Sequence, residues 1–259
     1  MADSWTEGDA YEQYMGRWSR LVAPRFVRWL QVAPELRWVD VGCGTGALTA
    51  TVLQLASPTA VVALDPSAGF VEEARRRAVD PRAEFRVGTA EEVPADVADV
   101  AVSGLVLNFV PDPDAAVRAM AAAVGHGTVA AYVWDYGGRM QLLRTFWDVA
   151  CALDVTAIDL DEAQRFPLCE PPALVDLWER VGLGEVRTAS IEVTTDFEDF
   201  DDLWQPFLGG TGPAPTYVGT LDTAARERLR EAMARMVHPE PDGRIRMHAR
   251  AWAVRGEAA

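Results

Sequence analysis

The residues with the clearest chemical potential form a glycine-rich run, WVDVGCGTGA at 38–47, and an acid that follows the next apolar run. Glycines let a turn close tightly and let its backbone approach a ligand, and a helix that begins after the turn offers free N–H groups. Asp65 lies 19 residues after Gly46, where a carboxylate can accept both hydroxyls of a ribose. A glycine pair alone also fits an ordinary strand–turn–helix, so it is Asp65 that indicates a nucleoside site.

Two kinds of nucleoside ligand fit this turn. Gly42-x-Gly44-x-x-Ala47 satisfies the loose dinucleotide pattern GxGxxG/A, which brings a pyrophosphate and a nicotinamide-dependent oxidoreductase as an alternative. Asp40, however, lies two residues before Gly42, and its carboxylate would repel a pyrophosphate. The same carboxylate would attract an ammonium group. Asp40 therefore favours S-adenosylmethionine, which carries an ammonium and a sulfonium.

The elements that must position these residues alternate along the first half of the chain. Continuously apolar runs separated by helical patterns predict an α/β fold, doubly wound, with a parallel sheet covered on both faces. The expected strands are 36–41, 60–64, 83–87, 97–103 and 128–134, and the expected helices are 47–55, 68–79 and 114–124.

The pattern changes after residue 135. Helical stretches are expected at 137–153, 171–180 and 223–236, with strands at 185–193 and 244–254. We expect residues 1–259 to form a single domain with an N-terminal helical lead-in at 1–34. Two insertions, 136–170 and 195–240, are expected to shape the pocket of an acceptor molecule.

The run Asp40-Val-Gly42-Cys-Gly44-Thr-Gly46, with Asp65 after the second strand, resembles the class I S-adenosylmethionine-dependent methyltransferases. It is most similar to the small-molecule branch that includes ubiquinone- and menaquinone-biosynthesis-type enzymes. The segment YEQYMGRWS at 11–19 resembles the lead-in helix of one bacterial subgroup. The resemblance implies a mostly parallel, seven-stranded Rossmann-like sheet with an antiparallel last strand and helical insertions.

The resemblance also implies roles for individual residues in holding the cofactor. The turn would face its methionine part, with Asp40 at the ammonium, while Asp65 would bind the ribose. Thr89 and Ala90 stand where the family often has Gly-Asp-Ala at the adenine. The full set of implied cofactor-binding residues is Tyr11, Arg17, Asp40, Gly42, Cys43, Gly44, Asp65, Pro66, Thr89, Ala90 and Ser103.

Methyl transfer is an in-line displacement at an activated methyl group, so the protein mainly aligns the nucleophile with the sulfur. A general base is needed only for an acceptor that holds its proton tightly. Candidates at the carboxyl ends of the strands are Asn108, which can orient a hydroxyl, and Asp135, which could act as a base or only cap a turn. The residues expected to bind the acceptor are Trp18, Asn108, Trp134 and Phe207.

The amino-acid composition limits the classes of molecule that the protein is expected to bind. With 24 Lys and Arg against 39 Asp and Glu, the net charge of −15 argues against nucleic acid and anionic lipid as partners. The acidic runs at 159–162 and 198–202 are expected on the solvated surface. Three cysteines without a CxxC pair predict neither a disulfide framework nor a metal site.

The N-terminus lacks the apolar segment of a signal peptide, and no apolar run is long enough to span a bilayer. We expect a cytoplasmic enzyme that transfers a methyl group to a small-molecule acceptor. The alternative is a protein of the same fold that binds S-adenosylmethionine without methylating. The sequence leaves the acceptor, the attacking atom and the oligomeric state open.

Overall fold

The structure is a computed structural model that describes residues 16–209 and 212–259. Tyr11, an expected cofactor ligand, lies outside these ranges. The chain divides into two compact units. Residues 19–134, 168–191 and 251–259 form the first, called here the sheet unit. Residues 16–18, 135–167, 192–209 and 212–250 form the second, called here the helical unit.

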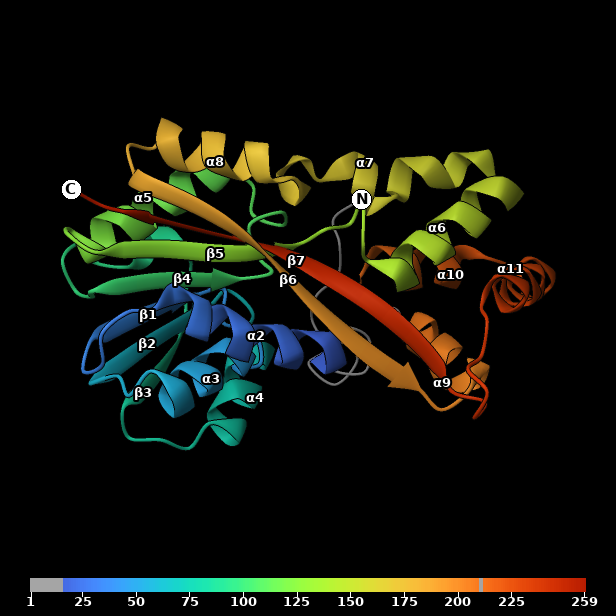
Figure 1. Cartoon of the computed structure of the whole chain (residues 1–259), viewed down its shortest axis with the longest axis horizontal. Helices are drawn as coiled ribbons and strands as arrows, with labels where there is room; N and C mark the ends of the chain where they lie inside the picture. Colours follow the sequence, from blue (N-terminus) through green and yellow to red (C-terminus); the bar gives the residue numbers. More distant parts are fainter. Residues whose placement is uncertain (1–15, 210–211) are drawn as a thin grey trace. The chain divides into compact units, whose positions relative to one another are not determined.

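Seven strands form one sheet in the order β3-β2-β1-β4-β5-β7-β6 (Figure 1). The first five pair in parallel, whereas β7 is antiparallel to β5. The expected α/β fold with an antiparallel last strand is therefore confirmed. The strands are β1 (Arg37–Val41), β2 (Ala60–Asp65), β3 (Ala83–Val87), β4 (Val100–Gly104), β5 (Thr128–Trp134), β6 (Gly184–Phe197) and β7 (Ile245–Glu257).

The strands β6 and β7 contribute residues to both units, as does the helix α2 (Arg17–Leu30). The last two strands are also longer at their carboxyl ends than the sequence pattern suggested. The other helices of the sheet unit are α3 (Ala47–Leu55), α4 (Ala68–Arg77), α5 (Pro113–Val124) and α8 (Pro171–Arg180), with short 3-10 turns η2 (Ala90–Glu92) and η4 (Pro167–Cys169, which begins one residue before this unit).

Helix starts in the sheet unit follow from local chemistry. The Ser67 hydroxyl accepts a hydrogen bond from the Phe70 N–H at the start of α4. Asp112 does the same for the Ala115 N–H at the start of α5, where Pro113 occupies the first turn. Side-chain oxygens at these positions satisfy N–H groups that have no partner inside the helix, and a proline there loses nothing.

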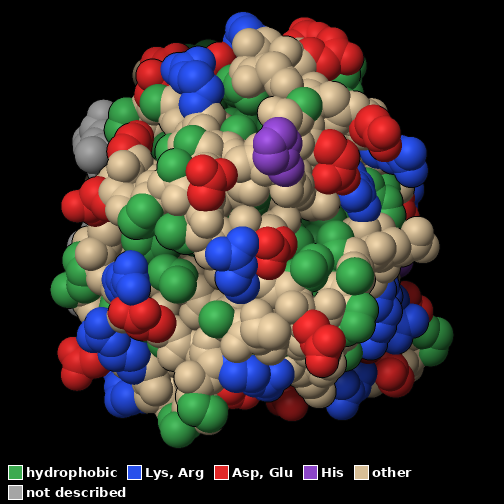
Figure 2. Space-filling view, turned by 90° about the vertical axis from the view of Figure 1, so that its left-hand side faces the viewer, with side chains coloured by type: hydrophobic (Ala, Val, Ile, Leu, Met, Phe, Trp, Pro, Cys, Tyr) green, Lys and Arg blue, Asp and Glu red, His purple; other side chains and the backbone are tan. Residues whose placement is uncertain are grey.

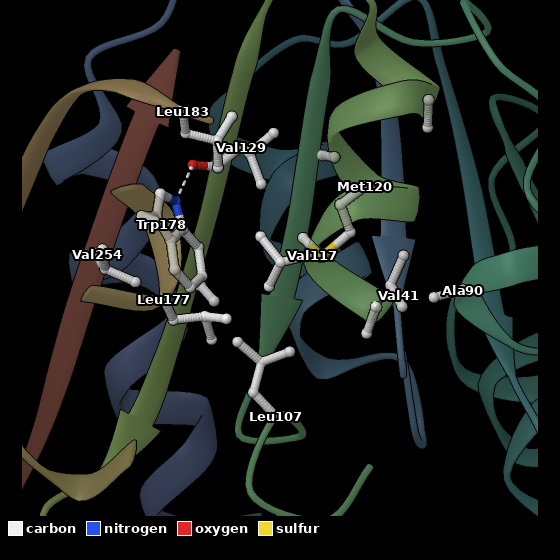
Figure 3. Close-up of a cluster of buried hydrophobic side chains, with 14 of the residues drawn as sticks. Val41, Ala90, Leu107, Val117, Met120, Val129, Leu177, Trp178, Leu183 and Val254 are labelled. Carbon is white, nitrogen blue, oxygen red and sulfur yellow. Dashed lines mark hydrogen bonds between the residues drawn. The ribbon is translucent and has the colours of Figure 1, made fainter. Parts of the chain in front are cut away.

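The core of the sheet unit lies on both faces of the sheet. Neighbouring residues of a strand point to opposite faces, and in β2 Leu64 belongs to one buried cluster while Ala63 belongs to another. Figure 3 shows the larger cluster, in which α5 and α8 pack on the strands. Trp178 of α8 belongs to it and donates from its indole nitrogen to the carbonyl of Val129 at 3.1 Å. Burial on both faces explains why these strands are continuously apolar.

The helical unit packs around aromatic side chains. Phe146 and Phe207 stack with ring centroids 4.6 Å apart, and Trp147 meets the edge of Phe146 at 5.0 Å. Its helical elements are α6 (Gln141–Leu153), η3 (Val155–Leu160), α7 (Glu162–Arg165), α9 (Phe200–Trp204), η5 (Gln205–Leu208), α10 (Pro213–Thr220) and α11 (Thr223–Met236).

One expectation about the acidic runs is wrong. Asp161 and Glu162 are buried rather than solvated, at 4% and 1% exposure. Arg144 holds the Asp161 carboxylate with two nitrogens, at 2.8 and 2.9 Å. Trp147 donates its indole N–H to Glu162. A charged residue type is rarely buried unless a partner compensates, and here both partners come from α6, which the run itself does not reveal.

The surface carries charges of both signs. On the face that Figure 2 shows, acidic and basic side chains are interspersed rather than gathered into one basic field. Within the described ranges, no helix is long and apolar enough to cross a membrane. The same ranges hold no group of three or more His, Cys, Asp or Glu side chains that could bind a metal ion.

Candidate functional site

The glycine-rich turn connects β1 to α3 at the carboxyl end of the sheet. Gly42 and Gly44 have φ angles of 73° and 53°, in the left-handed region that favours glycine. A Cβ on Gly42 would lie only 2.5 Å from the side chain of Val106, whereas a Cβ on Gly44 would meet nothing within 4 Å. The turn thus packs on the loop after β4 at Gly42 and leaves its backbone accessible at Gly44.

Asp65 ends β2 and helps to shape the turn. Its carboxylate accepts hydrogen bonds from the Gly44 N–H at 3.0 Å and from the Ser67 N–H at 2.9 Å. Burial raises the pKa of this carboxyl, and the two N–H donors oppose that rise. Because each carboxylate oxygen has two lone pairs, both oxygens can still accept a further hydrogen bond.

Asp40 lies in β1 with an exposure of 1%. Its Oδ2 accepts the hydroxyl proton of Thr49 in α3 at 2.6 Å, while its Oδ1 has no hydrogen-bond partner among the described residues. Burial raises the pKa of Asp40 to about 7, and the nearby Asp65 carboxylate adds to the rise. A buried carboxylate oxygen without a donor is costly, so this position suits a ligand that brings a cation.

Two more buried oxygens lack partners in the part of the chain that the structure describes. One is the hydroxyl of Ser103, a fully buried residue of β4, and the other is Oδ1 of Asn108. The Asn108 side chain is oriented by its amide nitrogen, which donates to the Cys169 sulfur at 3.4 Å. Asn108 belongs to the same loop as Val106, which packs on the glycine turn, so the loop carries an available acceptor close to that turn.

The start of this loop is strained. Leu105 follows β4 directly and has a φ of 66°, a conformation that side-chain-bearing residues rarely adopt. Its N–H donates to the carbonyl of Tyr132 in β5 at 2.7 Å, which helps to hold it there. Such strain concentrates at ligand sites, where surrounding structure enforces it.

The remaining expected residues of the sheet unit have simpler environments. Pro66 is exposed beside Asp65, and Cys43 is buried in the turn, where burial and the two nearby carboxylates raise the pKa of its thiol. Thr89 begins η2, and its N–H donates to Glu92 at 2.7 Å. Ala90 belongs to the large hydrophobic cluster. Trp134 ends β5 with 2% exposure.

Three expected residues in the helical unit have internal partners. The guanidinium of Arg17 donates two hydrogen bonds to Asp202, the shorter at 2.9 Å, and lies 4.5 Å from the ring centroid of Phe197. Trp18 is fully buried, with its ring 6.2 Å from that of Phe197. Phe207 belongs to the aromatic cluster of this unit.

Asp135 is engaged as a cap and an ion-pair partner. Its carboxylate accepts from the N–H groups of Gly138 and Arg139, at 2.9 and 3.0 Å. The guanidinium of Arg250 donates to it at 2.7 Å. These three donors favour the expectation that Asp135 caps a turn over the expectation that it acts as a base.

Sequence reasoning missed Thr49 and Cys169, the partners of Asp40 and Asn108. A signal for Thr49 existed, because Thr49 and Thr51 are the polar residues on the otherwise apolar buried side of α3 (ALTATVLQL). Cys169 is 61 residues from Asn108, and no pattern connects the two.

Comparison with known proteins matches residues 39–132 to the family model of a methyltransferase domain. The matched segment contains the glycine turn, Asp40, Asp65 and the loop after β4. This part of the chain is therefore similar to the methyltransferase-domain family. Proteins of known structure share the fold of this chain at low identity. YcgJ of Bacillus subtilis is 15% identical with a TM-score of 0.57, and the match covers 91% of this chain and 97% of that one.

A second solved structure is phosphoethanolamine N-methyltransferase 2 of Haemonchus contortus, in complex with S-adenosyl-L-methionine. Its TM-score is 0.58 at 14% identity, and the match covers 97% of this chain and 57% of that chain. At such identity the likeness concerns the fold.

Curated relatives match this chain at higher identity over a shorter stretch. Trans-aconitate 2-methyltransferase of Mycolicibacterium gilvum is 42% identical over 84 residues, 32% of this chain and 31% of that protein. The chloroplastic 2-methyl-6-phytyl-1,4-hydroquinone methyltransferase 2 of Oryza sativa subsp. japonica is 31% identical over 117 residues, 44% of this chain. The match spans about a third of the length of these relatives, 31% and 34%.

Proposed function

We propose that the turn between β1 and α3 binds S-adenosylmethionine and that the protein transfers its methyl group to a small-molecule acceptor. The observation that carries the proposal is Asp40 Oδ1, a buried carboxylate oxygen without a partner in the described chain, beside a turn built to approach a ligand. The match of residues 39–132 to the methyltransferase-domain family and the names of the relatives support it.

The residues present fit this cofactor. Asp65 retains lone pairs for the two ribose hydroxyls, and the space above Gly44 admits a ligand close to the backbone. Asp40 offers Oδ1 to the ammonium group. A dinucleotide fits less well, because the Asp40 and Asp65 carboxylates would both repel its pyrophosphate. Thr89, Ala90 and Pro66 remain the proposed contacts of the adenine, and Ser103 a further contact of the methionine part.

The bound cofactor would supply an activated methyl group, and the task of the chain is alignment and exclusion of water. Asn108 is the proposed residue that orients the acceptor. Its Oδ1 is available to accept a hydrogen bond from a hydroxyl or an N–H group, and Cys169 fixes the amide. An amide cannot remove a proton near neutral pH, so Asn108 orients rather than acts as a base. The donors around Asp135 support a structural role for it.

The acceptor is proposed to be a small organic molecule. The printed names of the relatives include a hydroquinone and trans-aconitate, and the net charge of −15 disfavours a nucleic acid. Trp18, Trp134 and Phe207 remain proposed acceptor contacts, and Arg17 and Tyr11 remain proposed cofactor contacts. The three free cysteines support a reducing compartment such as the cytoplasm.

Methyl transfer can be tested without knowing the acceptor. The purified protein is incubated with methyl-labelled S-adenosylmethionine and a cell extract filtered to remove macromolecules, beside an Asp65→Ala control. We expect label in a small-molecule product with the wild type only. Binding of the cofactor without transfer to any extract would identify a non-methylating binder, and transfer that survives in Asp65→Ala would contradict the proposed site.

A further inference from the structure

The contact between Asp40 and Thr49 has a feature that cofactor binding alone does not account for. Thr49 has no exposed surface, and α3 brings two donors to Asp40. The Thr49 hydroxyl donates to Oδ2 at 2.6 Å, and its backbone N–H also bonds to this carboxylate. Oδ1 receives nothing from the described residues. Thr49 therefore supplies a hydrogen bond to one carboxylate oxygen of Asp40, while the other oxygen has no partner among the described residues.

The surroundings of Asp40 disfavour the ionised form of its carboxyl. The groups that face it are the Asp65 carboxylate at the end of β2, the Cys43 thiol in the turn and Thr49 on α3. Arg75 of α4 acts on Cys43, and the described residues include no ion pair to Asp40 itself. Because burial and Asp65 both oppose ionisation, the bonds from Thr49 are the main contribution that favours the charged form.

We propose that Thr49 is a positioning residue for the cofactor: it satisfies Oδ2 of Asp40 and leaves Oδ1 as the oxygen of that carboxylate that receives the ammonium group. This inference rests on the proposed binding of S-adenosylmethionine. It assigns to Thr49 a share of the affinity for the amino-acid part of the ligand and none of the affinity for the nucleoside part.

A proton and the ammonium group of the ligand should therefore compete for the Asp40 carboxylate. The pKa of Asp40 is about 7 without a ligand, so below this pH most of the carboxylate must lose a proton before it can pair with the cation. Affinity then falls by up to about tenfold for each pH unit below the pKa. Removing the Thr49 hydroxyl raises the pKa further, so the pH at which affinity begins to fall moves upward.

The test compares two ligands and two variants by isothermal titration between pH 6 and 8.5. S-adenosylhomocysteine carries the ammonium, whereas 5′-methylthioadenosine keeps the nucleoside and lacks it. Thr49→Val removes the hydroxyl at constant shape, and Thr49→Ser retains it. For Thr49→Val at pH 7 we expect S-adenosylhomocysteine to bind roughly tenfold or more weakly, as for loss of a hydrogen bond to a charged group.

The same variant is expected to bind 5′-methylthioadenosine as the wild type does, which also shows that it is folded. Thr49→Ser is expected to restore the wild-type affinity and pH profile for S-adenosylhomocysteine. An equal loss for both ligands in Thr49→Val would assign Thr49 to the structure of the turn and overturn the proposal. An unchanged affinity for S-adenosylhomocysteine, or a wild-type affinity that does not depend on pH, would overturn it as well. A wild type that binds neither ligand would instead refute the proposed function.

Discussion

Glu162 should make the stability of the protein fall as pH rises through the neutral range. It is 1% exposed in α7, and burial raises the pKa of its carboxyl to about 8, although the hydrogen bond from Trp147 and the charge of Arg165 oppose the rise. The pKa of an unperturbed glutamate is 4.5. Between these values the folded chain holds a proton that the unfolded chain releases.

The sign and size of the change in the free energy of unfolding follow from the difference in proton binding between the folded and the unfolded chain. Stability from Glu162 is fully present below pH 4.5 and is lost as pH rises to about 8, because the unfolded chain binds fewer protons in that window. At about 1.4 kcal/mol per pH unit, the whole window is worth about 5 kcal/mol. Glu162→Gln cannot titrate and can still accept from Trp147. The variant should therefore resemble the wild type at pH 5 and be more stable by several kcal/mol at pH 8.

The assay is urea denaturation of both proteins at pH 5, 6, 7 and 8. Asp40 titrates in the same range, but its contribution is common to both proteins and cancels in their difference. The exposed Glu231 provides a control, since Glu231→Gln should change the free energy of unfolding by less than about 0.5 kcal/mol at each pH. A difference between wild type and Glu162→Gln that stays constant from pH 5 to pH 8 would refute the reasoning.

Two further substitutions test the turn and the cap. Gly42→Ala should cost roughly 3 kcal/mol and abolish S-adenosylhomocysteine binding, because it adds a clash with Val106 to a left-handed backbone, whereas Gly182→Ala, with φ 88° and open space, should cost about 1 kcal/mol. Equal losses of unfolding free energy for Gly42→Ala and Gly182→Ala in urea denaturation would contradict the expected clash with Val106. Asp135→Ala should lower the free energy of unfolding by about 3 kcal/mol, because the partly buried Arg250 loses its 2.6 Å ion pair and the N–H groups of Gly138 and Arg139 lose their acceptor. The exposed Asp196→Ala should cost under about 1 kcal/mol. A loss of methyl transfer without a loss of stability would instead make Asp135 a base.

Much of the sheet unit could be predicted because its information is local. Apolar runs buried on both faces identify β1, β2 and β5, and the glycine turn lies in one stretch of ten residues. The position of Asp65 at the end of β2 follows from the same alternation. These features depend on backbone conformation and on burial, which short stretches of sequence determine.

Roles that depend on distant partners could not be predicted. Arg17 and Asp202 are 185 residues apart, and Asp135 and Arg250 are 115 apart, so their ion pairs appear only in the folded chain. The acidic run that holds Glu162 looks solvated because its compensating partner, Trp147, belongs to another helix. The expected single domain, the pocket-shaping insertions and the acceptor contacts stay predictions.

The central claim is that the turn with Asp40 and Asp65 holds S-adenosylmethionine, and titration calorimetry of wild type and Asp65→Ala with S-adenosylhomocysteine tests it most directly. The account predicts one-site binding to the wild type, at least roughly tenfold weaker binding to Asp65→Ala because ribose hydrogen bonds to a charged group are lost, and no binding of NAD. Binding of NAD without binding of S-adenosylhomocysteine would contradict it.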